Sequence, residues 1–106
     1  MPAVLIYVTA PSEAEALRIG RTLVEGRLAA CANVIPQMTS IFRWEGRLQQ
    51  ESEAVLIVKT VADHAGAVIE RIKAIHSYSC PCAVVLPITG GNPAFLDWIG
   101  AETAPV

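Results

Sequence analysis

The sequence contains little charge and no long apolar run. Of its 106 residues only 17% are charged, and the formal net charge is −2. Because no run of Lys and Arg is present, we do not expect nucleic acid as a partner. No apolar run reaches the roughly 18 residues that span a bilayer, and residues 2–10 are too short for a signal peptide with a basic flank. We therefore expect no membrane partner.

Cysteine is scarce as well. The three cysteines, Cys31, Cys80 and Cys82, form an odd set that does not describe a disulfide framework. Thiols of this kind remain reduced in the cytosol, so we expect a cytoplasmic protein. Motifs of catalysis are also missing: no Ser-His-Asp set, H-E-x-x-H motif, paired carboxylates or P-loop stands out. We therefore expect no enzyme activity.

Apolar residues, in contrast, are abundant. They make up 53% of a chain that is long enough for a single domain, residues 1–106, with a core of its own. A small monomer has much surface to solvate, so this excess indicates that some apolar side chains lie in an interface between subunits.

Hydrophobic periodicity predicts an ordered series of strands and helices. The expected strands are 4–8, a long strand in the stretch 28–47 that ends in a turn at residues 45–47, then 48–60 and 83–86. The expected helices are 13–26, a second that follows its cap Asp63 and reaches about residue 76, and a third from 93 to about 99. Ser12 and Glu15 match the capping box of the first helix, which Gly26 ends as its C-cap. Asp63 is expected to cap the second helix, and Asn92 caps the third with a proline after it.

Residues 28–47 form the longest of the expected strands. Ser40, Phe42 and Trp44 alternate with other side chains, a period typical of a strand with one buried face. Pro36 cannot donate a ladder hydrogen bond, so we expect a bulge or a strand edge there. Together with strand 48–60, this segment predicts a long β-hairpin whose far end packs outside its own subunit.

The order of these elements predicts an α+β fold, the ferredoxin-like split βαβ sandwich, as βαββαβ plus a C-terminal helix. Two helices can cover one face of a four-stranded sheet, yet three of the strands are apolar on both faces. Leaving Val, Ile and Leu side chains in water forgoes about 1.5–3 kcal/mol each. We therefore expect another copy of the same sheet to cover the second face, in a homo-oligomer.

His76, Cys80 and Cys82 form the sharpest chemical cluster. Two thiols one residue apart, with an imidazole four residues before the first, suit a soft or borderline ion such as Cu(I) or Zn(II). The C-x-C spacing is not one of the strong zinc patterns, however. The alternative is that both cysteines are small buried side chains at the start of a strand. Cys31 is interpreted as a packing residue.

A second group of residues is typical of a polar cleft or an interface. Lys59 ends an apolar strand and Tyr78 follows the second helix, so both can line a cleft, although Lys59 can equally extend into solvent. Trp44 and Trp98 are interpreted as packing or interface anchors. His64 is expected to be a solvated residue in the first turn of its helix.

The chain contains, in this order, LAACANVIP, TSIFRWEG, an apolar strand ending in Lys59-Thr60, AVIERIKAIH-x-Y and LPITGGNPAFLDWI. Together these blocks resemble the CutA divalent-cation tolerance family over residues 4–100. The resemblance implies a tight homotrimer of ferredoxin-like subunits, whose long hairpins reach their neighbours and whose interface includes Phe42, Trp44 and Trp98. It also implies binding of divalent cations, copper foremost, and a role in the response to metal ions.

Individual positions depart from the family's pattern. The ligands proposed for copper in bacterial members are a cysteine on the first strand and histidines at the end of the second helix. Val8 and Ile75 occupy two of these positions, so only His76 remains. In the loop that usually reads H-P-Y-x-x-P-E, Ser77 replaces the proline and Cys82 the glutamate. The gain of two thiols suggests a softer ion, with His76, Cys80 and Cys82 as its ligands.

Two other functions are compatible with such a fold. The trimer of the family is similar to that of the PII signalling proteins. This likeness implies, as the alternative, a small-molecule sensor or scaffold with Lys59, Tyr78 and Trp44 in clefts between subunits. An acylphosphatase-type enzyme would need an arginine-bearing phosphate loop, which is not evident in the sequence.

Overall fold

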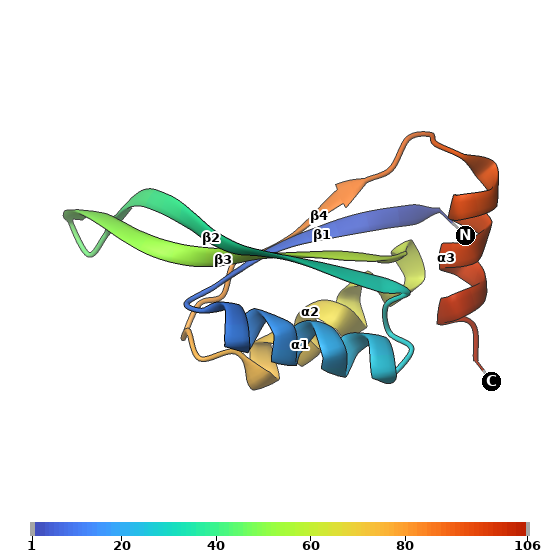
Figure 1. The fold of residues 1–106 in the computed structure, drawn as a ribbon, viewed down its shortest axis with the longest axis horizontal. Coiled ribbons are helices and arrows are strands. Elements are labelled where there is room, and N and C mark those ends of the chain that lie inside the picture. The colour runs from blue at the N-terminus through green and yellow to red at the C-terminus, as the bar shows by residue number, and fades with distance from the viewer. Residues whose placement is uncertain (1, 106) are drawn as a thin grey trace.

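The four strands form one antiparallel sheet in the order β2-β3-β1-β4. A computed structural model describes residues 2–105, and in it helices α1 and α2 lie side by side on one face of this sheet (Figure 1). The elements are β1 Ala3–Ala10, α1 Glu13–Glu25, β2 Cys31–Trp44, β3 Arg47–Val61, a 3-10 turn Ala62–His64, α2 Ala65–Ile75, β4 Ala83–Pro87 and α3 Pro93–Thr103. This order confirms the predicted α+β ferredoxin-like arrangement with an added C-terminal helix.

The core lies between the sheet and helices α1 and α2. Alternate residues of β1 and β3 point toward the helices, because side chains of a strand face opposite sides in turn. Gly20 lets α1 approach closely, since a Cβ there would lie 3.0 Å from Ala32 Cβ and 3.1 Å from Leu56 Cδ1. The largest fully buried side chains of this core are Ile6, Val8, Ile19, Leu23, Leu56, Val58, Val68 and Ile72.

β2 and β3 extend far beyond the sheet as a long hairpin, as predicted (Figure 1). They are joined by Glu45 and Gly46, which have φ values of 51° and 76°. Positive φ at both central residues is the geometry of a type I′ turn, whose twist matches that of the strands.

The predicted irregularity at Pro36 is a β-bulge. Ile35 lies opposite Val55 while Met38 lies opposite Glu53, so the chain of β2 gains one residue between them. Such an insertion exchanges the two faces of a strand. Odd-numbered residues of β2 share a face with Val55 before the bulge, and even-numbered residues such as Phe42 and Trp44 take that face after it.

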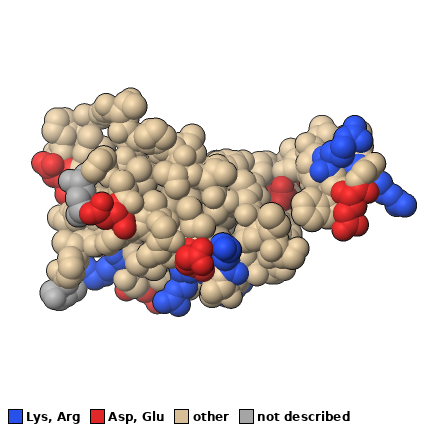
Figure 2. Space-filling view, turned by 180° about the vertical axis from the view of Figure 1, so that it is seen from behind, with Lys and Arg blue, Asp and Glu red and all other residues tan. Residues whose placement is uncertain are grey.

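The sheet face opposite α1 and α2 is apolar and partly exposed. Within residues 2–105, only α3 packs there, at one end, through a cluster that contains Val61 and Ile99. Val84 is 51% exposed and Leu86 is 45% exposed. Figure 2 shows charged side chains at the hairpin tip and along the lower edge of the molecule, one acidic patch where the hairpin joins the body, and a largely uncharged upper surface. The expectation of a second apolar face is confirmed, whereas the trimer that would cover it stays a prediction.

The first helix has half of the expected capping box. The Ser12 hydroxyl accepts a hydrogen bond from the Glu15 backbone N–H at 3.2 Å, as predicted. The reciprocal half is wrong, because the Glu15 carboxylate accepts hydrogen bonds from Ser77 instead. Gly26 is the C-cap with an ordinary φ of −81°, and the left-handed residue is Arg27, at φ 59°.

The ends of the other helices also differ from the predictions. Asp63 lies in the 3-10 turn, and the residue before α2 is His64, whose side chain caps nothing because its backbone is already helical. His64 is only partly exposed, and its Nδ1 is buried without a hydrogen-bond partner among residues 2–105. α3 runs to Thr103 instead of Ile99. No helix within residues 2–105 is long and apolar enough to cross a membrane.

Candidate functional site

A cleft of about 710 Å³ opens where the hairpin leaves the sheet, on the face away from α1 and α2. We call it the hairpin cleft. It lies between the outer half of the hairpin, the end of β1 and the loop 77–82 that joins α2 to β4. The residues of this loop form no helix or strand, so its conformation depends on side-chain contacts.

Aromatic side chains form much of the cleft wall. Phe42 and Trp44 enter from β2, Tyr7 from β1 and Tyr78 from the loop 77–82. The bulge at Pro36 places Phe42 and Trp44 on this face, because without the extra residue they would point to the other side. The sequence identified Trp44 and Tyr78 as cleft residues, and both line the hairpin cleft.

Two carboxylates from β3, Glu51 and Glu53, also line the cleft. Glu53 is only 9% exposed, and its Oε2 accepts a hydrogen bond from Tyr78 Oη at 2.8 Å. Burial, and then the neighbouring Glu53, raise the pKa of Tyr78 well above its usual range, so the phenol stays a neutral donor. Sequence reasoning missed Glu53, because a single acid in the predicted strand 48–60 gives no signal that its side chain is buried.

Both thiols of the C-P-C segment line the same cleft. Cys80 is exposed, and Cys82 is partly buried just before β4. Burial, and then the negative charge of Glu53, raise the pKa of the Cys82 thiol, partly offset by a hydrogen bond with Thr9. The Cys82 thiol is therefore protonated at neutral pH and must lose this proton to bind a metal ion.

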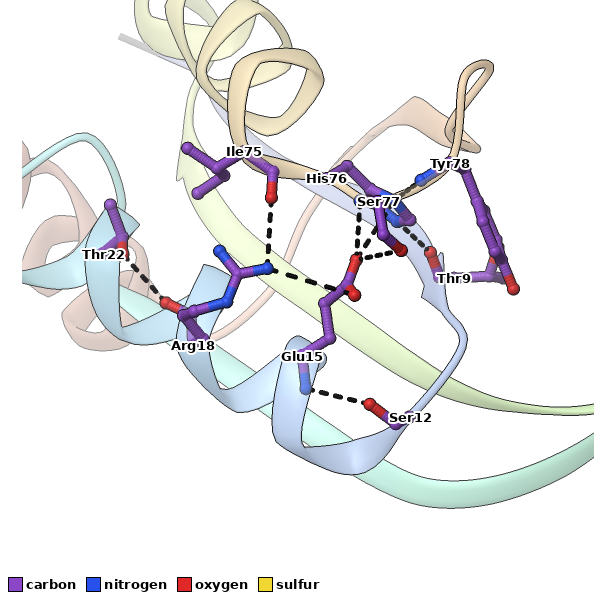
Figure 3. Close-up of polar contacts among 9 residues, drawn as sticks. All are labelled: Thr9, Ser12, Glu15, Arg18, Thr22, Ile75, His76, Ser77 and Tyr78. Carbon is purple, nitrogen blue, oxygen red and sulfur yellow. Dashed lines mark hydrogen bonds and ion pairs between the residues drawn. The ribbon is translucent and has the colours of Figure 1, made fainter.

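His76 lies away from the cleft, in a polar network that joins α1 to the end of α2 (Figure 3). Its side chain is fully buried. Nδ1 lies 3.0 Å from the Tyr78 backbone N–H donor, and Nε2 lies 2.8 Å from Thr9 O. This pattern assigns the ring proton to Nε2, which donates to Thr9, while Nδ1 accepts from Tyr78. In this conformation His76 fixes the start of the loop, and neither nitrogen is available to a metal ion.

Glu15 anchors the same loop from helix α1. Its Oε2 accepts hydrogen bonds from the Ser77 backbone N–H and from Ser77 Oγ, each at 2.9 Å. Arg18 donates to Ile75 O at 3.1 Å beside it. Burial alone would raise the pKa of Glu15, but the Ser77 hydrogen bonds, followed by His76 and Arg18, lower it below the usual value. No sequence signal pointed to these contacts, since Glu15 and Ser77 lie 62 residues apart.

The three predicted metal ligands are thus only partly brought together. Cys80 and Cys82 share the hairpin cleft, whereas the His76 nitrogens face Thr9 and Tyr78. Among the described residues, 2–105, no three His, Cys, Asp or Glu side chains are grouped so as to hold an ion. The full set of His76, Cys80 and Cys82 does not fit one metal ion in this conformation, and binding by the two thiols stays a prediction.

Lys59 does not line the hairpin cleft. Its Nζ lies 5.4 Å from the centroid of the Phe95 ring on α3. Trp98 lies on the same helix, with its ring centroid 5.4 Å from that of Phe95. Lys59 therefore contacts an aromatic cluster at the opposite end of the sheet from the hairpin. The predicted interface roles of Phe42, Trp44 and Trp98 are not tested by the single chain.

Comparison with known proteins gives one consistent family. The profile of a family described as CutA1 divalent ion tolerance protein matches residues 4–102. The Divalent-cation tolerance protein CutA of Thermus thermophilus is 44% identical over 99 residues, which are 93% of this chain and 96% of that protein. The structure of the Periplasmic divalent cation tolerance protein CutA from Archaeoglobus fulgidus matches with a TM-score of 0.93 at 42% identity, over 96% of this chain and 99% of that one.

A plant relative is longer than this chain. The crystal structure of CutA1 from Oryza sativa matches with a TM-score of 0.95 at 36% identity, over 100% of this chain and 97% of that chain. The match to the chloroplastic Protein CutA 1 of Oryza sativa subsp. japonica spans only 58% of that protein.

Proposed function

Because the chain belongs to the CutA1 divalent ion tolerance family, we propose that it is a homotrimer that binds metal ions in the response to divalent cations. Copper is the proposed ion, with zinc second. The observation that carries the proposal is the pair of thiols, Cys80 and Cys82, in a cleft that the carboxylates of Glu51 and Glu53 also line. The proposed role is binding and not catalysis.

The cleft offers suitable ligand chemistry for a soft ion. Thiolates prefer Cu(I) and Zn(II) over hard cations. Glu53 places a negative charge beside Cys82, which attracts a cation while it disfavours the free thiolate. Binding therefore releases a thiol proton, and affinity is expected to rise with pH. His76 acts by holding the loop that carries the thiols.

Cytoplasmic location is part of the proposal, because reduced thiols are needed for this chemistry. Some relatives are named otherwise: the Oryza sativa protein is named chloroplastic and the Archaeoglobus fulgidus protein periplasmic.

Isothermal titration of the reduced protein with Cu(I) and with Zn(II) tests the thiol site. The Cys80→Ser/Cys82→Ser variant is expected to lose Cu(I) binding. Cys31→Ser is the matched control, since Cys31 lies on β2 outside the cleft, with Sγ 3.7 Å from Asn33 Oδ1. Equal Cu(I) affinity in the double variant and the control would remove these thiols as ligands.

A second candidate function is small-molecule binding, as in a sensor or scaffold. Its supporting observation is the size and lining of the hairpin cleft: about 710 Å³, with Trp44 and Tyr78 in the wall. Small-molecule pockets generally measure about 300–1,000 Å³ and are lined by apolar and aromatic groups. A ligand of the cleft is expected to raise the melting temperature by mass action, which a thermal-shift screen measures.

A further inference from the structure

Glu53 is a nearly buried carboxylate that has no cation in its own chain. It is 9% exposed, and its Oε2 accepts a hydrogen bond from the neutral phenol of Tyr78. Its other oxygen, Oε1, accepts no hydrogen bond within residues 2–105 and is not fully buried, so it faces the hairpin cleft. None of the ion pairs formed within these residues includes Glu53. Because a desolvated carboxylate is costly without an opposite charge, this position favours a cation.

Lys59 has the opposite charge and also lacks a counter-charge. It lies six residues after Glu53 on β3, and the side chains of a strand alternate between faces. Since Leu56 and Val58 lie in the core under the helices, Glu53 and Lys59 share the other face of the sheet. Lys59 is partly buried, with its Nζ 5.4 Å from the Phe95 ring centroid and no ion pair within residues 2–105.

One chain cannot bring these two charges together. Six residues of strand span about 20 Å, which is far beyond the reach of an ion pair. The face that carries both charges is the apolar face that further copies of the chain are proposed to cover. In a threefold ring every interface joins two different patches, so each copy can offer Lys59 to one neighbour and receive a lysine at Glu53 from the other. The ring then leaves neither charge unpaired.

The other cations of the chain suit Glu53 less well. Arg43 lies on the opposite face of the hairpin from Trp44. Arg47 shares the face of Glu53, but it is exposed at the hairpin tip, where a solvated guanidinium gains little from an ion pair. The remaining five donate to backbone carbonyls, pair with an acid or lie on the helices that cover the other face: Arg18, Arg21, Arg27, Arg71 and Lys73.

We propose that assembly places the Lys59 ammonium of one copy on the Glu53 carboxylate of the next copy. Each Glu53 thereby gains a counter-charge that its own chain cannot supply. This inference rests on the homotrimer proposed above and names a contact that holds it together.

The contact is compatible with the proposed thiol site. Cys80 and Cys82 remain the metal ligands, and Glu51 still adds a negative charge to the cleft lining. The charge of Glu53 disfavours the Cys82 thiolate in the single chain. An ammonium beside Glu53 offsets that charge, so the Cys82 thiol is expected to lose its proton more readily in the trimer.

A double-mutant cycle on subunit exchange tests the proposal. Isotope-labelled and unlabelled trimers are mixed in a fixed concentration of urea, and native mass spectrometry follows the appearance of mixed trimers. Glu53→Gln removes the charge but keeps an acceptor for Tyr78, and Lys59→Met removes the charge but keeps an apolar contact for the Phe95 ring. Arg47→Gln, alone and with Glu53→Gln, is the matched control on the same face of β3.

We expect Glu53→Gln and Lys59→Met each to speed exchange at least about tenfold, because either change leaves the other charge unpaired in the interface. The double variant should exchange about tenfold or more slowly than the product of the two single effects. Residues about 20 Å apart in one chain would act additively, so such coupling indicates contact between copies. Arg47→Gln should leave exchange unchanged, alone or added to Glu53→Gln.

Crosslinking of the unmodified protein gives an answer even if a variant fails to fold. A carbodiimide joins an amine and a carboxylate in contact as an amide, with loss of water. In mixed trimers we expect peptides linked from Lys59 to Glu53, including pairs with one labelled and one unlabelled member. Lys59 linked to a different carboxylate, or pairs that always carry the same isotope, would overturn the inference.

The outcomes of the cycle separate this inference from the trimer on which it rests. Additive effects of Glu53→Gln and Lys59→Met would overturn the contact while leaving the trimer. Coupling of Glu53 with Arg47 would assign the hairpin tip to Glu53 in place of Lys59. A parent protein that forms no trimer would remove the proposed assembly together with this inference.

Discussion

A few side chains decide the shape of the hairpin cleft. Glu15 and His76 accept hydrogen bonds from the backbone N–H groups of Ser77 and Tyr78, the first two residues of the loop 77–82, and the Tyr78 hydroxyl donates to Glu53. The sequence alone identified Tyr78, Cys80 and Cys82 of this loop as candidate site residues, together with Trp44. Their partners were not, because Glu15 and Ser77, or Glu53 and Tyr78, meet only through the tertiary fold.

Replacement of Glu15 tests the loop anchor. Glu15→Gln is expected to lower the free energy of unfolding at neutral pH by about 1–3 kcal/mol, because Ser77 then donates to a neutral acceptor. The folded pKa of Glu15 lies below its usual value of 4.5. Its contribution is therefore complete above pH 4.5 and is lost as the pH falls through the folded pKa. Urea unfolding at a series of acidic pH values measures this loss.

Glu13→Gln is the control for that series, since Glu13 is an exposed acid of the same first helical turn. The Glu15→Gln variant should lack the acid-dependent loss that the Glu13→Gln variant retains. Identical pH dependence in the two variants would show that Glu15 does not anchor the loop.

Replacement of Tyr78 tests its hydrogen bond to Glu53 in the cleft. Tyr78→Phe removes the hydroxyl donor from a buried carboxylate and is expected to cost about 1–3 kcal/mol of stability. The pKa of Tyr78 is raised above its usual value of 10, so its contribution is present below pH 10 and is lost as the pH rises further. Above pH 10, the free energy of unfolding of the parent protein should fall more steeply with pH than that of Tyr78→Phe. Matching alkaline profiles would contradict the buried contact.

At the scale of elements, periodicity was sufficient for the order of strands and helices. The proline at Pro36 predicted the bulge, but not its consequence, because the change of face depends on the pairing register with β3. The end of α3 was placed too early. Its last turn carries Thr103, which is 3% exposed and donates its hydroxyl hydrogen bond to Ile99 O, and the apolar period gives no signal for such a residue.

The turn of the hairpin offers a test at this scale. Gly46→Ala is expected to destabilise the protein by about 1–2 kcal/mol, because a Cβ disfavours the positive φ of 76°. Glu45→Asn is expected to stabilise the protein instead, since Asn tolerates positive φ and Asn-Gly is preferred in type I′ turns. Thermal unfolding at one protein concentration measures both. If Glu45→Ala stabilised as much as Glu45→Asn, turn geometry would not be the cause.

At the scale of the whole molecule, the exposed apolar face of the sheet is the feature that one chain leaves unexplained. The sequence predicted this face from strands that are apolar on both sides, and the structure confirms it. Leu86→Glu places a charge on that face and is expected to dissociate the proposed trimer into smaller species. Sedimentation velocity measures the change, with Ala67→Glu on exposed α2 as the control. A trimer that persists in Leu86→Glu would exclude this face from the interface.

Native mass spectrometry of the reduced protein, with and without Cu(I), tests the central claim most directly because it reports assembly and metal content together. The account predicts a species of three chains that gains copper, with the copper lost in Cys80→Ser/Cys82→Ser while the trimer remains. A folded single chain, or a trimer that takes up no copper, would contradict it.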